Sequence, residues 1–174
     1  TSIGSDAFYD CTSLASINIP NRITVIKGFT FEGCSSLTSI VIPDGVNRIE
    51  QHAFSRCTLL NSVTMPDRLT KIEDNVFSYC SSITSINIPD EVTEIGYSAF
   101  EGCTSLASII IPNGVTNIAS NTFKGCSSLA SVTIGNGVTS IEMLAFSGCS
   151  SLTSIVIPNR VTSIANSAFR NCTS

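Results

Sequence analysis

The stretch that decides the fold is CSSLTSIVIPDGVNRI, residues 34–49. Residues 37–42 alternate in polarity, are rich in β-branched side chains and end at Pro43, which predicts a short strand and its stop. Pro43-Asp44-Gly45 is a turn sequence. Val46 and Ile49 then supply a second apolar pair, which predicts another short extended segment on a different side of the chain.

The same stretch recurs along the whole chain. Cysteines stand 23 residues apart, each preceded at three residues by Phe, and each Phe is preceded at five residues by Ile. The eight cysteines are Cys11, Cys34, Cys57, Cys80, Cys103, Cys126, Cys149 and Cys172. A fixed period is the mark of a repeat architecture. The sequence therefore predicts a single domain over residues 1–174, built from about seven and a half repeats without linker or caps.

A 23-residue unit is too short to hold a strand and a long crossover helix. The copies are therefore expected to stack as a solenoid, each strand pairing in parallel with its equivalent in the next coil. In every coil a Leu, three Ile, a Val, the Phe and the Cys are predicted to face the core. The segment before each Cys, with Ala-Phe and small residues, predicts one helical or 3₁₀ turn.

Composition excludes several classes of function. Apolar residues make up 43% of the 174 residues, charged residues 13%, and the net charge is −4. High hydropathy with low charge argues against disorder, and the absence of a basic stretch argues against nucleic-acid binding. No apolar run reaches the ~18 residues that span a membrane. The one histidine, His52, occupies a variable position and is interpreted as a surface residue. We expect no enzyme activity, no catalytic residue, no metal and no cofactor.

The candidate binding surface is the residue between the two strand isoleucines of each coil, a position that varies while its neighbours do not. The row comprises Asn18, Val41, Thr64, Asn87, Ile110, Thr133 and Val156. It predicts a shallow, uncharged binding surface on the concave face. The alternative interpretation is an exposed sheet of strand-favouring residues without a ligand.

Three further rows each have a structural alternative. A serine row runs beside the candidate surface, from Ser16 to Ser154, and is interpreted as hydroxyls bonded along the stack. A threonine row from Thr24 to Thr162 could match ice or a polysaccharide, or is a set of good strand residues. Asp44, Asp67 and Asp90 could bind Ca²⁺ weakly, or begin turns after Pro. Asn171-Cys172-Thr173 matches a glycosylation sequon.

The cysteines are predicted to form a ladder of buried free thiols. Each occupies the same place in its coil, so the side chains stack in parallel, whereas a disulfide needs Cβ atoms that face each other. Buried thiols act as small hydrophobes.

The pattern C-x-x-L-x-S-I-x-I-P-x-x-V-T-x-I-x-x-x-A-F, repeating at 23 residues over the whole chain, resembles the BspA-like, or treponemal-type, leucine-rich repeat. The resemblance implies a right-handed solenoid with a parallel sheet on its concave face. It also implies a secreted or surface-exposed protein involved in adhesion, host-protein binding or co-aggregation. No catalytic motif comes with it.

Two functions follow as expectations. The first is a non-enzymatic module of a surface adhesin that binds a protein or glycan on a host or neighbouring cell through the concave face. The second is a structural protein that stacks end to end into filaments, because both ends of the sequence fall inside a repeat and would expose core and strand edges.

Overall fold

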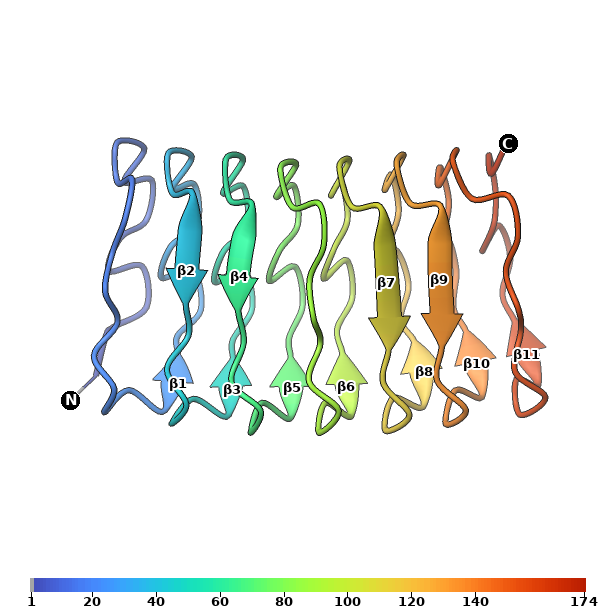
Figure 1. Cartoon of the computed structure of the whole chain (residues 1–174), viewed down its shortest axis with the longest axis horizontal. Helices are drawn as coiled ribbons and strands as arrows, with labels where there is room; N and C mark the ends of the chain where they lie inside the picture. Colours follow the sequence, from blue (N-terminus) through green and yellow to red (C-terminus); the bar gives the residue numbers. More distant parts are fainter. Residues whose placement is uncertain (1) are drawn as a thin grey trace.

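The computed structural model describes residues 2–174 as a stack of similar coils (Figure 1). Every strand pairing is parallel and joins residues 23 positions apart, as in Ile26 with Ile49 and Ile49 with Ile72. The predicted solenoid with parallel strands is therefore confirmed. Its register follows from the period, because an uninterrupted 23-residue repeat brings each side chain next to its equivalent.

The longer strands lie on one side of the stack, called here the strand face, nearest the viewer in Figure 1. They are β2 (Ser39–Val41), β4 (Ser62–Thr64), β7 (Ser108–Ile111) and β9 (Ser131–Ile134). β2 pairs with β4 and β7 with β9, and the segment at residues 85–88 between these pairs joins β7 only through a bridge between Ser85 and Ser108. The continuous sheet expected from the repeat is thus divided into pairs within the described residues.

Among residues 2–174, seven two-residue strands run behind the strand face. β1 (Val25–Ile26), β3 (Arg48–Ile49), β5 (Lys71–Ile72) and β6 (Glu94–Ile95) form one sheet, and β8 (Asn117–Ile118), β10 (Ser140–Ile141) and β11 (Ser163–Ile164) form another. They are the second extended segments that the sequence predicts. Each begins two residues after Val46 or the residue equivalent to Val46 in its own coil. β1, β3, β5, β6, β8 and β10 each place one Ile against the core.

The segment around each Phe is not the helical or 3₁₀ turn that the sequence predicts. No helix of either kind is found in residues 2–174. The chain instead makes consecutive turns, in which for example Cys34 N donates to Phe31 O at 3.1 Å and Leu37 N to Cys34 O at 3.0 Å. The residues two before and two after Phe have positive φ, 59° at Phe29 and 72° at Gly33. A left-handed residue cannot continue a right-handed helix, so each turn closes separately.

The core is a set of side-chain columns that run along the stack. Phenylalanine rings from Phe8 to Phe169 stack on one another with centroids 5.3 to 5.6 Å apart and nearly parallel planes. From Phe31 to Phe146 these rings are fully buried, whereas Phe8 and Phe169 are half-buried in the end coils. Each coil therefore covers its neighbour's core, and stability comes from contacts between adjacent repeats.

The predicted buried thiols are confirmed from Cys34 to Cys149, all of which are free, whereas Cys11 is exposed and Cys172 half-buried. Each buried Sγ points at the carbonyl oxygen of the Phe in the preceding coil, at 3.1 Å for Cys57 to Phe31 and 3.2 Å for Cys103 to Phe77. Burial raises the pKa of these thiols, to about 11 at Cys34 and about 12 at Cys103. The column is thus held protonated as a weak donor inside the core.

Candidate binding surface

The strand face presents two exposed rows of side chains. All seven residues of the predicted row, from Asn18 to Val156, are exposed, and so is the parallel serine row from Ser16 to Ser154. Strand geometry explains this, because successive side chains point to opposite faces. In β7, Ser108 and Ile110 point outward while Ile109 and Ile111 are buried.

Apolar side chains stand out on this face at three places. Val41 and Ile110 are each 66% exposed and Val156 is 83% exposed, values that a core residue never reaches. Val41 lies opposite Thr64 and Ile110 opposite Thr133, so apolar residues are interspersed with polar ones along the stack. Such a mixed surface offers both van der Waals contact and hydrogen bonds to a partner.

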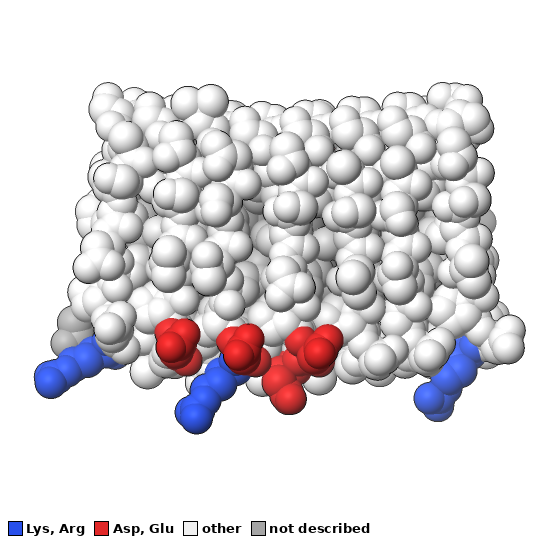
Figure 2. Space-filling view, in the orientation of Figure 1, with Lys and Arg blue, Asp and Glu red and all other residues white. Residues whose placement is uncertain are grey.

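The strand face carries no charge. Figure 2 shows Lys, Arg, Asp and Glu side chains only along its lower edge, below an uncharged surface. Ion pairs lie instead with the short strands behind, such as Lys71 with Glu94 at 2.9 Å and Lys27 with Glu50 at 3.3 Å. Depletion of charge at the centre is a feature that this face shares with the cores of protein interfaces.

A shallow hollow of about 190 Å³ lies on the strand face between two coils that are paired there by a single isolated bridge. It is lined by Ser85, Ile86, Asn87, Ser108, Ile109 and Ile110. Asn87 and Ile110 border it from adjacent coils, whose strand-face segments are paired by the bridge between Ser85 and Ser108. Two members of the predicted row therefore meet at one site, with an amide and an aliphatic side chain beside each other.

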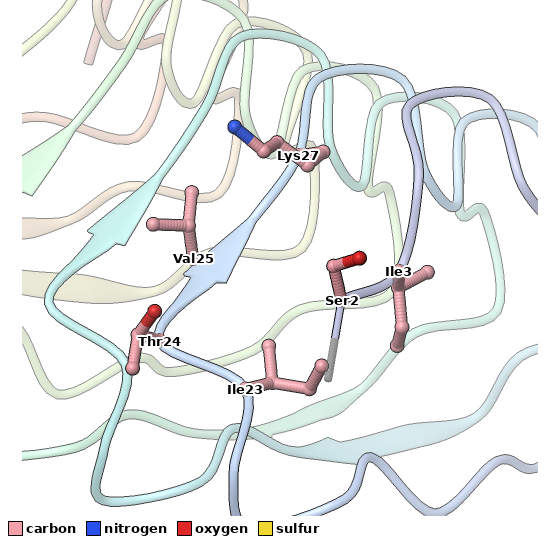
Figure 3. A pocket seen from close by; sticks show the side chains of 6 residues that line it. All are labelled: Ser2, Ile3, Ile23, Thr24, Val25 and Lys27. Atoms are coloured by element: carbon pink, nitrogen blue, oxygen red, sulfur yellow. The ribbon is translucent and has the colours of Figure 1, made fainter.

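A second hollow of about 190 Å³ lies at the first coil, away from the predicted row (Figure 3). It is lined by Ser2, Ile3, Ile23, Thr24, Val25 and Lys27. Figure 3 shows these side chains grouped around β1 and the segment before it. None of them belongs to the candidate surface.

The hydroxyl rows behave differently from one another. Threonines of the row behind the strand face donate to the preceding coil, Thr139 Oγ1 to Thr116 O at 3.0 Å and Thr70 Oγ1 to Asn47 O at 3.3 Å. This supports the structural interpretation of that row. No such bond joins the hydroxyls of the strand-face serine row among residues 2–174, so the predicted serine ladder is not formed and these hydroxyls face solvent.

His52 is less exposed than the sequence predicts. Its side chain is 31% exposed, its ring stacks on Phe29 at 4.8 Å, and its Nδ1 lies 3.9 Å from Glu32 Oε2. It belongs to the turn segment and not to the strand face, so it cannot serve the serine row as a base. Within residues 2–174 no group of three or more His, Cys, Asp or Glu side chains is arranged to hold a metal ion.

The fold and surface define a leucine-rich-repeat solenoid, a non-catalytic repeat scaffold that typically serves protein interaction. The chain belongs to the BspA type leucine rich repeat family, which it matches over residues 1–107 and 93–174. No curated protein matches it in sequence. No helix among residues 2–174 has the length and hydropathy to cross a bilayer.

Solved structures of bacterial proteins show the same fold. A leucine-rich-repeat protein of Treponema pallidum has 34% identity and a TM-score of 0.84, over 91% of this chain and 74% of that one. A leucine-rich cell surface protein of Faecalibacterium prausnitzii has 40% identity and a TM-score of 0.81, over 91% of this chain and 44% of that one. A Eubacterium ventriosum leucine-rich-repeat protein, at 24% identity and a TM-score of 0.79 over 88% of this chain and 41% of that one, shares the fold.

Proposed function

We propose that the chain is a non-enzymatic binding module of a surface or secreted adhesin, and that its ligand is a protein bound on the strand face. The observation that carries the proposal is the pairing of Asn87 and Ile110 at the hollow, on an uncharged face that also exposes Val41. Exposed apolar groups within an uncharged centre favour a protein partner, because interface cores are depleted of charge.

A surface location is supported by the Faecalibacterium relative, which is a cell surface protein. A glycan on the same face is the alternative ligand, since the outward hydroxyls of Ser85 and Ser108 and the Asn87 amide offer hydrogen bonds next to Ile110. The two ligands make different demands on the face. A protein would need the apolar residues of several coils, whereas a glycan would depend on the hollow alone.

The test is a double variant, Asn87→Arg with Ile110→Arg, which places two charged side chains over the hollow. The control is Asn117→Arg with Ser163→Arg, two exposed residues of β8 and β11. Their row already holds Arg48 and Lys71, so it accepts long cations. The wild type, the strand-face variant and the control variant would each be tested by surface plasmon resonance on immobilised fibronectin, laminin and collagen. Each would also be tested on a glycan array.

We expect at least one matrix protein to bind the wild type and the control equally and the strand-face variant at least about tenfold more weakly, as for a central interface residue. Unchanged binding by the strand-face variant would contradict the proposed site. Binding to glycans alone, abolished by the same variant, would establish the alternative ligand on this face.

A further inference from the structure

Aromatic and polar side chains contact one another in the turn segments of the coils of Phe77, Phe100 and Phe123. The backbone of these segments lies behind the strand face in Figure 1. The centre of this group of side chains is the carboxylate of Glu101. Tyr79 Oη donates to Glu101 Oε1 at 3.4 Å, Lys124 Nζ lies 2.9 Å from the same oxygen, and Ser98 Oγ donates to Oε2 at 2.7 Å. Side chains from three consecutive coils therefore converge on one carboxylate.

Tyr79 occupies a backbone position that disfavours it. Its φ is 59°, in the left-handed region, and the equivalent residues in four other coils are Gly33, Gly102, Gly125 and Gly148. A bulky residue is strained there, and such strain is a pointer to function. The Tyr79 ring lies over Gly102, where an added Cβ would be only 2.6 Å from the ring atom Cδ1. A Gly in the next coil thus lets the ring lie flat along the surface.

A second tyrosine completes the group. Tyr97 is 47% exposed and Tyr79 is 50% exposed. Glu101 raises the pKa of Lys124, and the phenols of Tyr79 and Tyr97 make smaller contributions in the same direction. Tyr97 Oη accepts a hydrogen bond from the Asn121 amide nitrogen. Each tyrosine is therefore tied to the group by one hydrogen bond, Tyr79 to Glu101 and Tyr97 to Asn121, and about half of each residue is exposed to solvent.

Asn121, next to Tyr97, has a side-chain oxygen without a hydrogen-bond partner among the described residues. The residue is only 6% exposed, its amide nitrogen points at Tyr97, and its Oδ1 has no partner among residues 2–174. A buried polar atom without a partner is uncommon and calls for an explanation. A ligand hydroxyl would supply this partner if the side chain moved so that the buried Oδ1 faced the surface beside Tyr97.

We propose that Tyr79, Tyr97, Glu101, Lys124 and Asn121 form a second binding site, separate from the strand face, that takes a pyranose unit of a neutral glycan. A sugar ring has an apolar C–H face that packs on an aromatic ring and a rim of hydroxyls that both donate and accept. The group offers the matching parts: two exposed rings, a carboxylate acceptor, an ammonium donor and an amide.

The charges explain why the ligand is neutral. The carboxylate of Glu101 and the ammonium of Lys124 compensate each other at 2.9 Å, so these two side chains carry no net charge. The nearby Asp74, whose Oδ1 accepts from Tyr97 N at 2.8 Å, disfavours an anion. Burial raises the pKa of Glu101, but hydrogen bonds from Ser98 and Lys124 outweigh it, and the pKa lies below the ordinary value. The carboxylate is thus ionised and oriented before any hydroxyl arrives.

The chain provides its own spectroscopic test, because it has three tyrosines and no tryptophan. Protein carrying ¹³C-labelled tyrosine rings would be titrated with cellohexaose, maltohexaose, laminarihexaose and chitohexaose at millimolar concentration, and with a tryptic peptide mixture. Tyr9, which lies in the first coil and is 48% exposed, is the internal control. We expect the ring signals of Tyr79 and Tyr97 to shift with at least one oligosaccharide and those of Tyr9 to stay in place.

The matched variants are Tyr79→Gly and Arg56→Gly. Both replace a residue with positive φ at the same position of its coil, 59° and 60°, by the residue found in four other coils, so both are expected to fold. Tyr79→Gly should weaken the oligosaccharide at least about tenfold, the loss of a central aromatic contact, and Arg56→Gly should bind as the wild type does. Shifts with none of the four oligosaccharides, equal shifts at Tyr9, or shifts with peptides alone would overturn the proposal.

Discussion

Alkaline pH should destabilise this protein through its thiol column. The six cysteines from Cys34 to Cys149 are fully buried, and burial raises the pKa of each, to about 11 at Cys34 and to about 12 at Cys103 and at Cys149, from the ordinary 9.0. A group whose pKa is raised by folding contributes stability that is complete below its unfolded pKa and is lost as the pH rises toward the folded pKa. The loss should therefore begin near pH 9.0.

The magnitude follows from the number of thiols that ionise only in the unfolded chain. Each lowers the free energy of unfolding by about 1 kcal/mol per pH unit, so the six together should remove roughly 6 to 8 kcal/mol at about pH 10. That is comparable with the whole stability of an ordinary domain, roughly 5 to 15 kcal/mol. Few other groups of the core titrate in this range, because the remaining columns are Phe, Leu, Ile and Val.

The assay is urea unfolding followed by far-ultraviolet circular dichroism, with a reductant present, at several pH values from neutral to about pH 10. Cys103→Ala should reduce the slope of the free energy of unfolding against pH by the amount that about one ionising thiol contributes, whatever it does to stability at neutral pH. Cys11→Ala, at the exposed cysteine, should leave the dependence unchanged. A free energy of unfolding that stays level up to about pH 10, or a Cys103→Ala protein with the wild-type slope, would refute the reasoning.

Three further predictions concern stability. Phe77→Ala, in the middle of the phenylalanine column, should lower the free energy of unfolding by about 3 to 5 kcal/mol. Phe169→Ala, at a half-buried ring of the last coil, should lower it clearly less. Equal losses in urea unfolding would contradict stacking between neighbouring coils. Gly135→Pro restores the residue of six other repeats, yet it should lower the melting temperature, since a Cβ there would lie 2.5 Å from Pro112 O. The pKa of Glu101 is lowered by folding, so its contribution is present above pH 4.5 and lost as the pH falls through the folded pKa; Glu101→Gln should make acid unfolding less steep, and an unchanged acid profile would exclude this contribution.

Most of the fold follows from the period because one repeat dictates the environment of all its copies. Leu37, Ile40 and Phe54 are buried for the same reason as their equivalents 23 residues away, so inward positions could be predicted position by position. The predicted binding row from Asn18 to Val156 is exposed because alternation along a strand fixes which side chains face outward.

The turn segment was harder to predict. Ala-Phe with small neighbours suits a helical turn, but the positive φ at His52 and Arg56 closes each turn separately. Each coil has two left-handed positions, one before and one after its Phe. Some of them hold residues such as Phe29 and Tyr79, which carry no local signal of that conformation. Hydrogen bonds to the next coil, such as Arg56 N to Ser78 O at 2.8 Å, impose it from outside the segment.

The sequence by itself determined the solenoid, the parallel register, the buried columns and the exposed row of the strand face, since each depends only on the period and on the alternation within a strand. The tertiary structure alone decided that a hollow forms between Asn87 and Ile110, which the period already makes neighbours. It also decided that Tyr79 joins Glu101 and Lys124. Glu101 and Lys124 are 23 residues apart, so the period already makes them neighbours. Tyr79 stands at another position of its repeat, and its contact with Glu101 depends on side-chain reach and turn conformation, which a one-dimensional pattern does not contain.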